Sequence, residues 1–177
     1  MQTLQQLQAQ VKQNLRQILD YPKKGIIFRD ITTLLAHAEV FGNVISFLKN
    51  RYEKHNITHI VGIESRGFIF GSALAYALGV GFVPVRKKGK LPSKTYTQDY
   101  ALEYGTDTLE IHIDAFDFKP AHVVLIDDLL ATGGTAKASL ELIKKAGGEC
   151  IEACFLLRLL ECGSVTLPVS QFHILDI

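Results

Sequence analysis

Residues 123–135 constrain what this chain can fold into more than any other segment. Val123 to Ile126 is a run of β-branched and apolar residues, which is typical of a strand buried on both faces. Two carboxylates, Asp127 and Asp128, follow at once. Residues 129–135 then read Leu-Leu-Ala-Thr-Gly-Gly-Thr, and a helical pattern begins at Ala136. The segment therefore predicts a buried strand, an acidic end and a small-residue loop that opens a helix.

The remaining sequence alternates predicted helices and strands. Apolar residues at three- and four-residue steps predict helices over 4–19, 40–52, 68–78 and 136–146. Short apolar or alternating runs predict strands over 59–63, 80–86, 108–113, 123–126 and 151–157. An ordered loop is expected over 21–37. Residues 87–107 have little apolar periodicity, which favours a functional lid over regular structure. The alternation implies an α/β fold with a parallel sheet, whose ligands lie beyond the carboxyl ends of the strands, here after Ile63 and Ile126.

Composition limits the possible functions. A chain of 177 residues with a formal net charge of +1 is expected to be one soluble domain without a field that attracts nucleic acid or acidic membranes. Three cysteines at irregular spacing indicate neither a disulfide framework nor a zinc site, and the six histidines are scattered without ligand spacing. Neither a signal-peptide layout nor a membrane-spanning apolar run occurs, so a cytoplasmic location is expected.

The loop after the predicted strand has the chemistry of a phosphate site. Small residues allow the backbone to approach an anion, and the N-terminus of a helix adds partial positive charge. Asp127 and Asp128 would repel a phosphate, so they are expected to accept hydrogen bonds from sugar hydroxyls or to face a divalent cation. Together these features fit a ribose 5-phosphate. Neither a GxxxxGK[ST] nor a GxGxxG pattern is present, and the alternative is an acidic cap followed by a tight glycine bend.

Four ordered segments extend this interpretation to a family. Residues 123–135 resemble the phosphoribosyl pyrophosphate motif of the type I phosphoribosyltransferases. Gly25 to Ile31 is similar to the base-binding segment of the members that use adenine, and Glu64 to Phe68 to their pyrophosphate loop. Residues 86–92, continuing to 102–105, resemble their mobile catalytic loop. The resemblance covers roughly residues 10 to 157.

The resemblance implies a fold and a reaction. The fold is a central, mainly parallel sheet flanked by helices in a single domain, 1–177, with an N-terminal helix and base-binding hood over 1–36 and a mobile loop over 87–107. The reaction joins adenine to 5-phospho-α-D-ribose 1-diphosphate and yields AMP and diphosphate, as in purine salvage. Mg²⁺ as a cofactor, held mainly by substrate oxygens and water, and a homodimer are also implied.

The resemblance also assigns residues to roles. Glu103 is expected to exchange the proton of the base, and Arg66 and Lys90 to complete the catalytic set. The ribose and its 5′-phosphate are assigned to Asp127, Asp128, Ala131, Thr132, Gly133, Gly134 and Thr135. The pyrophosphate is assigned to Ser65, Arg66, Lys87 and Lys90, with a cis peptide between Glu64 and Ser65. Adenine is assigned to Ile27, Phe28, Arg29 and Leu129, and Tyr104 is expected to order the mobile loop or to cover the site.

Some segments depart from the family, and two alternatives stay open. Arg158 stands where an amide or acidic residue is more usual, and residues 162–177 form a short tail without the expected Gly-Arg segment. One alternative is an enzyme of the same fold that uses xanthine or another 6-oxopurine. The other is a non-catalytic regulatory module that senses phosphoribosyl pyrophosphate, which would normally carry a DNA-binding N-terminal domain.

Overall fold

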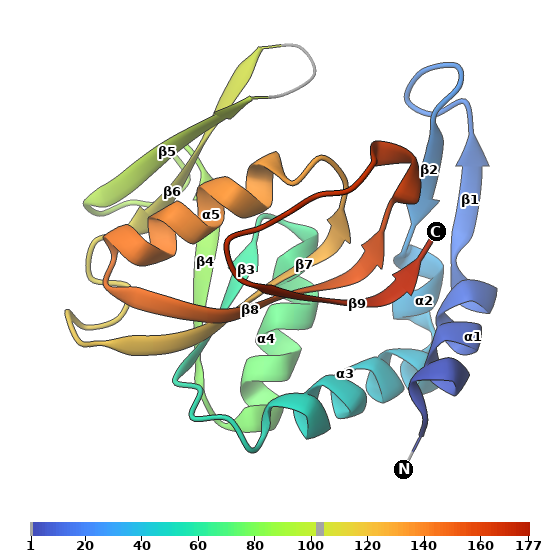
Figure 1. The fold of residues 1–177 in the computed structure, drawn as a ribbon, viewed down its shortest axis with the longest axis horizontal. Coiled ribbons are helices and arrows are strands. Elements are labelled where there is room, and N and C mark those ends of the chain that lie inside the picture. The colour runs from blue at the N-terminus through green and yellow to red at the C-terminus, as the bar shows by residue number, and fades with distance from the viewer. Residues whose placement is uncertain (1, 102–104) are drawn as a thin grey trace. The chain divides into compact units, whose positions relative to one another are not determined.

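The computed structural model of the protein describes residues 2–101 and 105–177 and divides into two compact units, Met1–Arg51 and Tyr52–Ile177 (Figure 1). The first unit contains α1 (Leu4–Asn14), β1 (Arg16–Leu19), β2 (Ile27–Asp30), α2 (Thr32–Ala36) and most of α3 (Ala38–Tyr52). The second contains β3 (His59–Ile63), α4 (Arg66–Leu78), β4 (Gly81–Lys87), β5 (Thr95–Ala101), β6 (Thr106–His112), β7 (Ala121–Leu130), α5 (Gly134–Lys145), β8 (Gly148–Arg158), a 3₁₀ turn η1 (Leu160–Cys162) and β9 (Ser170–Asp176).

The first unit begins with a helix that is shorter than predicted. Thr3 caps α1 in a reciprocal capping box with Gln6, and Leu7 and Val11 are buried. The prediction of a helix to residue 19 is wrong beyond Asn14. Residues 16–19 instead pair antiparallel with 27–30, so part of the expected loop at 21–37 is strand β2 and helix α2. The apolar spacing within one segment does not show that its residues pair with a strand 8 to 14 residues further along the chain, and this pairing overrides the helical periodicity.

The second unit is built on a seven-stranded sheet with the order β5-β6-β4-β3-β7-β8-β9. Five strands pair in parallel, and β6 pairs antiparallel with both β4 and β5. Alternate residues of β7 face different helices: Leu125 joins the core cluster of α5, whereas Ile126 lies against Gly71 of α4. The expected mainly parallel sheet flanked by helices is therefore confirmed.

The predicted elements of the second unit are mostly confirmed. The strand 59–63 is reproduced, and α4 starts two residues before the predicted helix and ends at Gly79, whose φ of 70° places it in the left-handed region. The expectation that 87–107 lacks regular structure is wrong for 95–101, which form β5 by pairing with β6. Strand β9 was not predicted. No helix in residues 2–101 and 105–177 has the length and apolar character needed to cross a bilayer.

Candidate active site

Asp127 and Asp128 lie within β7 and not after it. The strand was predicted to end at Ile126, but its pairing with β8 continues through Leu130, so the two acids occupy its carboxyl end. Asp128 is buried, and its Oδ2 lies 3.0 Å from Nε of Arg66 at the start of α4. Oδ1 of Asp127 accepts a hydrogen bond from the backbone N–H of Asp128 at 2.9 Å. The structure thus joins the predicted ribose acids and one predicted pyrophosphate residue in a single cluster.

The surroundings of the two acids raise the pKa of both. Burial raises the pKa of Asp127 well above its usual value, and the neighbouring charge of Asp128 raises it further. Burial also raises the pKa of Asp128, while the guanidinium of Arg66 opposes that change. Placing two negative charges side by side at the end of β7 is therefore costly, and Arg66 offsets part of that cost.

A small cavity lies beside these acids at the start of α5. It has a volume of about 70 Å³. Its lining residues are Asp127, Leu129, Leu130, Ala131, Thr132, Gly133, Thr135, Ala136 and Phe155. Gly133 is the N-cap of α5 with a φ of 80°, and it supplies no capping side chain. The first N–H groups of α5 are consequently suited to bind an anion, as the sequence predicts for 131–135.

The turn after β3 contributes the predicted pyrophosphate residues Ser65 and Arg66. The Glu64–Ser65 peptide is cis, as the family resemblance implies. The side chain of Glu64 accepts hydrogen bonds from the backbone N–H of Lys87 at 2.7 Å and from Nη2 of Arg86 at 3.3 Å. Burial raises the pKa of Glu64, but these two donors outweigh it and leave the pKa below its usual value. Glu64 thus fastens the turn to the end of β4.

Lys87 and Lys90 extend from the end of β4 toward the hairpin of β5 and β6. Nζ of Lys87 lies 3.2 Å from Oδ2 of Asp107, which also accepts from the hydroxyl of Tyr100 at 3.2 Å. The side chain of Lys90 is exposed, and its backbone N–H donates to the buried Glu110 at 2.9 Å. Asp107 thus positions the side chain of Lys87, and Glu110 fixes the backbone of the turn that carries Lys90. The sequence interpretation singled out neither acid.

Three of these acids could be recognised only in the structure. Glu64 was seen in the turn motif without a role, and Asp107 ended the expected lid. Glu110 falls on the face of the alternating segment 108–113 that would be solvent-exposed, yet the turn at 90–91 covers it and donates two N–H groups to it. No local signal in the sequence indicates that coverage.

The predicted adenine residues are divided between the two units. Ile27, Phe28 and Arg29 are consecutive on β2, and the Phe28 ring meets that of Tyr21 edge-on at a centroid distance of 5.2 Å. Leu129 lies on β7 and lines the small cavity. Glu103, expected to exchange the proton of the base, and Tyr104, expected to order the loop or cover the site, lie outside the described residues.

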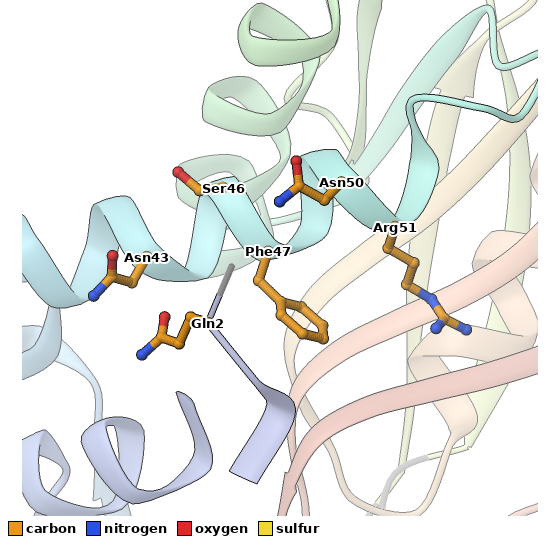
Figure 2. A pocket seen from close by; sticks show the side chains of 6 residues that line it. All are labelled: Gln2, Asn43, Ser46, Phe47, Asn50 and Arg51. Atoms are coloured by element: carbon orange, nitrogen blue, oxygen red, sulfur yellow. The ribbon is translucent and has the colours of Figure 1, made fainter. Parts of the chain in front are cut away.

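A larger hollow of about 550 Å³ lies in the first unit and involves none of the predicted site residues. Figure 2 shows its lining residues, which are Gln2, Asn43, Ser46, Phe47, Asn50 and Arg51. All except Gln2 belong to α3. This lining holds neutral amides, a hydroxyl, a ring and one guanidinium, so it lacks an acid that could bind sugar hydroxyls.

No group of three or more His, Cys, Asp and Glu side chains that could hold an ion occurs among residues 2–101 and 105–177. Asp127 and Asp128 supply the oxygen ligands that Mg²⁺ prefers, and Asp128 lies against Arg66 of the turn after β3. These residues fit a Mg²⁺ ion whose other ligands come from a phosphorylated substrate and water.

A mainly parallel sheet carries two acids at the end of β7, and the loop over 131–135 at the start of α5, the anion loop, is suited to bind an anion. This arrangement is that of the phosphoribosyltransferase class, and the model of the phosphoribosyl transferase domain matches residues 30–166. A curated adenine phosphoribosyltransferase of Helicobacter pylori strain G27 is 63% identical over 174 residues, which cover 96% of this chain and 97% of that protein. The chain therefore belongs to the adenine phosphoribosyltransferase family.

Solved structures agree with this assignment. The adenine phosphoribosyltransferase of Saccharomyces cerevisiae, complexed with an imino-altritol bisphosphate and adenine, has a TM-score of 0.89 and 37% identity, and the match covers 96% of this chain and 98% of that one. The Trypanosoma brucei enzyme, in complex with AMP, pyrophosphate and ribose-5-phosphate, has a TM-score of 0.86 and 27% identity over 96% of this chain and 79% of that one.

Proposed function

We propose that the protein transfers the 5-phosphoribosyl group of 5-phospho-α-D-ribose 1-diphosphate to N9 of adenine, releasing AMP and diphosphate in cytoplasmic purine salvage. The observation that carries this proposal is the adjacent pair Asp127 and Asp128 at the end of β7, next to the loop 131–135 at the start of α5, with the buried Asp128 paired to Arg66. A phosphorylated sugar with two adjacent hydroxyls and a pyrophosphate matches these three features together. Family membership supports the choice of adenine as the base.

The ribose and its phosphate are assigned to β7 and the following loop. Asp127 and Asp128 hold the 2′- and 3′-hydroxyls, so the sugar cannot rotate while its C1 bond breaks. The backbone of 131–135 and the hydroxyls of Thr132 and Thr135 hold the 5′-phosphate. Fixing both ends of the sugar converts the displacement into a reaction between positioned groups.

The leaving pyrophosphate is assigned to Ser65, Arg66, Lys87 and Lys90. Displacement at C1 passes through a sugar with oxocarbenium character, while negative charge collects on the leaving group, so no nucleophilic side chain is needed. Lys87 pairs with Asp107 at 3.2 Å and exchanges that partner for a pyrophosphate oxygen when substrate binds. Mg²⁺, when bound, supplies additional neutralisation of the pyrophosphate charge.

The base is assigned to Phe28, which stacks on the purine, with Ile27 and Arg29 reading its edge through backbone groups and Leu129 completing the contact. Backbone donors and acceptors distinguish an exocyclic amine from a keto oxygen because the wrong base leaves one of them unpaired. Glu103 takes the proton from the incoming base, and Tyr104 covers the site. The active form is proposed to be a homodimer.

A product assay tests the proposal directly. The protein is incubated with Mg²⁺ and phosphoribosyl pyrophosphate and with adenine, hypoxanthine, guanine or xanthine in turn, and nucleotide formation is followed by chromatography. We expect AMP from adenine alone. Nucleotide formation from a 6-oxopurine in place of adenine would assign another base, and no turnover with any base would refute the enzymatic proposal.

The role of Glu103 has its own test. Glu103→Gln should lower kcat more than it raises KM for adenine, because the amide cannot accept the proton. Glu141→Gln on the exposed face of α5 is the matched control and should leave both constants unchanged. An unchanged kcat in Glu103→Gln would remove this residue from the mechanism.

A further inference from the structure

The segment between η1 and β9 lies against the anion loop of α5. A Cβ built on Gly133 would overlap Cγ1 of Val165, would lie 3.6 Å from Cβ of Val165, and would lie 3.8 Å from Cδ2 of Leu167. Gly133 is the N-cap of α5 and belongs to the lining of the small cavity. Val165 thus occupies the volume that a side chain at Gly133 would need. In Figure 1 this segment is the dark red stretch that runs toward β9.

The position of Val165 is fixed from its own side. Val165, Leu167 and Val169 alternate along the segment and pack on the core cluster beneath α5, where Leu167 is fully part of the core. The backbone oxygen of Val165 accepts a hydrogen bond from Nε2 of Gln171 on β9 at 3.1 Å. Because β9 is a paired strand of the central sheet, Val165 is tied to the rigid part of the unit.

The contact with Val165 restricts the backbone of Gly133, which could otherwise adopt many φ/ψ conformations. A glycine adopts positive φ without penalty, but it also populates many other conformations. The N–H groups that follow Gly133 can bind the 5′-phosphate only if they share one orientation. A methyl group packed against Cα of Gly133 removes alternative conformations without occupying the space of the ligand.

We propose that Val165 is a positioning residue for the 5′-phosphate loop. This inference rests on the proposed function, since it deepens the assignment of 131–135 to the phosphate of the substrate. Val165 acts through the backbone of Gly133 and contacts neither the sugar nor the base. Its effect should therefore be specific to phosphoribosyl pyrophosphate.

The test compares Val165 with Val169. Both side chains are partly buried against the same core cluster, but Val165 is the one that lies against Gly133. Val165→Ala should loosen the loop 131–135 and thereby raise KM for phosphoribosyl pyrophosphate about fivefold or more. The values of kcat and of KM for adenine should stay within about twofold of those of the wild type. Val169→Ala removes the same atoms from the same core and should leave all three constants unchanged. Val165→Thr keeps the branched shape and should restore the wild-type KM. Melting temperatures identify an assay temperature at which every variant is folded.

Binding of inorganic phosphate, measured by calorimetric titration without substrates, gives a second reading that does not depend on turnover. Val165→Ala should bind phosphate about fivefold more weakly than wild type, and Val169→Ala equally well. Equal effects of the two alanine variants, or no effect of Val165→Ala, would overturn the inference. If the wild type shows no turnover with any purine but Val165→Ala still weakens phosphate binding, the proposed function fails and the role of Val165 stands.

Discussion

Gly67 brings the first turn of α4 against the end of β7, and Gly67→Ala tests how closely the site depends on that approach. A Cβ at this position would lie 2.7 Å from the backbone oxygen of Ile126, 3.0 Å from Oδ1 of Asp127 and 3.2 Å from its Cα. Two of these three atoms belong to the backbone of a central strand, so they cannot move aside as the end of a flexible side chain could. The substitution therefore forces α4 and β7 apart.

The size of the effect follows from the contact distance. Carbon and oxygen atoms ordinarily keep a separation of at least about 3.3 Å, so the helix and the strand must separate by about 0.6 Å. Overpacking of this kind costs typically about 1–3 kcal/mol, which offsets or exceeds the gain of about 1 kcal/mol from replacing a helical glycine by alanine. Because Arg66 and Asp128 lie on the two displaced elements, kcat/KM should fall by about 10- to 100-fold.

Gly42 provides the matched control. It is also a glycine inside a helix, α3, but a Cβ at Gly42 would meet nothing within 4 Å. Gly42→Ala should raise the free energy of unfolding by about 0.5–1 kcal/mol and leave AMP formation unchanged. Both variants are compared by urea denaturation and by initial rates of AMP formation. Wild-type activity in Gly67→Ala, together with a stability gain equal to that of Gly42→Ala, would refute the reasoning.

Three further predictions concern acidic residues. Replacing Asp127 and Asp128 together by Asn should lower kcat/KM by about 100- to 10,000-fold, because the carboxyl groups that hold the two sugar hydroxyls are lost. The melting temperature should stay within a few degrees of wild type, and an active double variant would exclude the ribose role. Glu110→Ala should raise KM for phosphoribosyl pyrophosphate by about tenfold because Lys90 loses its backbone acceptor, and Glu110→Gln, which retains an acceptor oxygen, should not. Hydrogen bonds from the backbone and side chain of Thr32, together with Arg16, lower the pKa of Asp30 to about 2. The contribution of Asp30 to the free energy of unfolding is therefore present above pH 4 and is lost as the pH falls toward 2. Asp30→Asn should reduce this pH dependence of the free energy of unfolding, measured by urea denaturation at successive pH values.

Strands and helices could be predicted from the sequence where a segment shows apolar periodicity within its own residues. Strand β3 and the helices α3 and α4 have apolar spacing that is visible in a short window, and the structure places them close to the predicted bounds. The strand predicted over 108–113 corresponds to β6, but the strands β1, β2 and β5 were missed because pairing with a neighbouring strand, and not an apolar face of their own, holds them in place. Strand β1 is exposed throughout, so no hydrophobic face marks it.

The candidate site was predictable where one motif carries its chemistry. Asp127, Asp128 and the loop 131–135 are consecutive, so their common location needed no tertiary information, and Arg66 was found through its motif. The acids that hold the basic groups could not be inferred. Asp107 and Glu110 act on Lys87 and on the backbone of Lys90 across strand pairings, and Val165 reaches Gly133 from a segment with no motif. Local patterns encode which groups a site contains, whereas packing between distant segments encodes how those groups are held.

The pairing of β7 with β3 has a consequence for the order of folding. The hydroxyl of Thr58, just before β3, donates to the backbone oxygen of His122 at the start of β7, 64 residues later in the chain. Closing a loop of this length is entropically unfavourable until intervening contacts have formed, and such non-local pairings slow folding. We therefore expect the strand that carries the two acids to join the sheet after the α4 and β4 region has assembled. The recovery of AMP formation during refolding should therefore lag behind the recovery of helical signal, and catalytic activity becomes a kinetic marker for completion of the sheet.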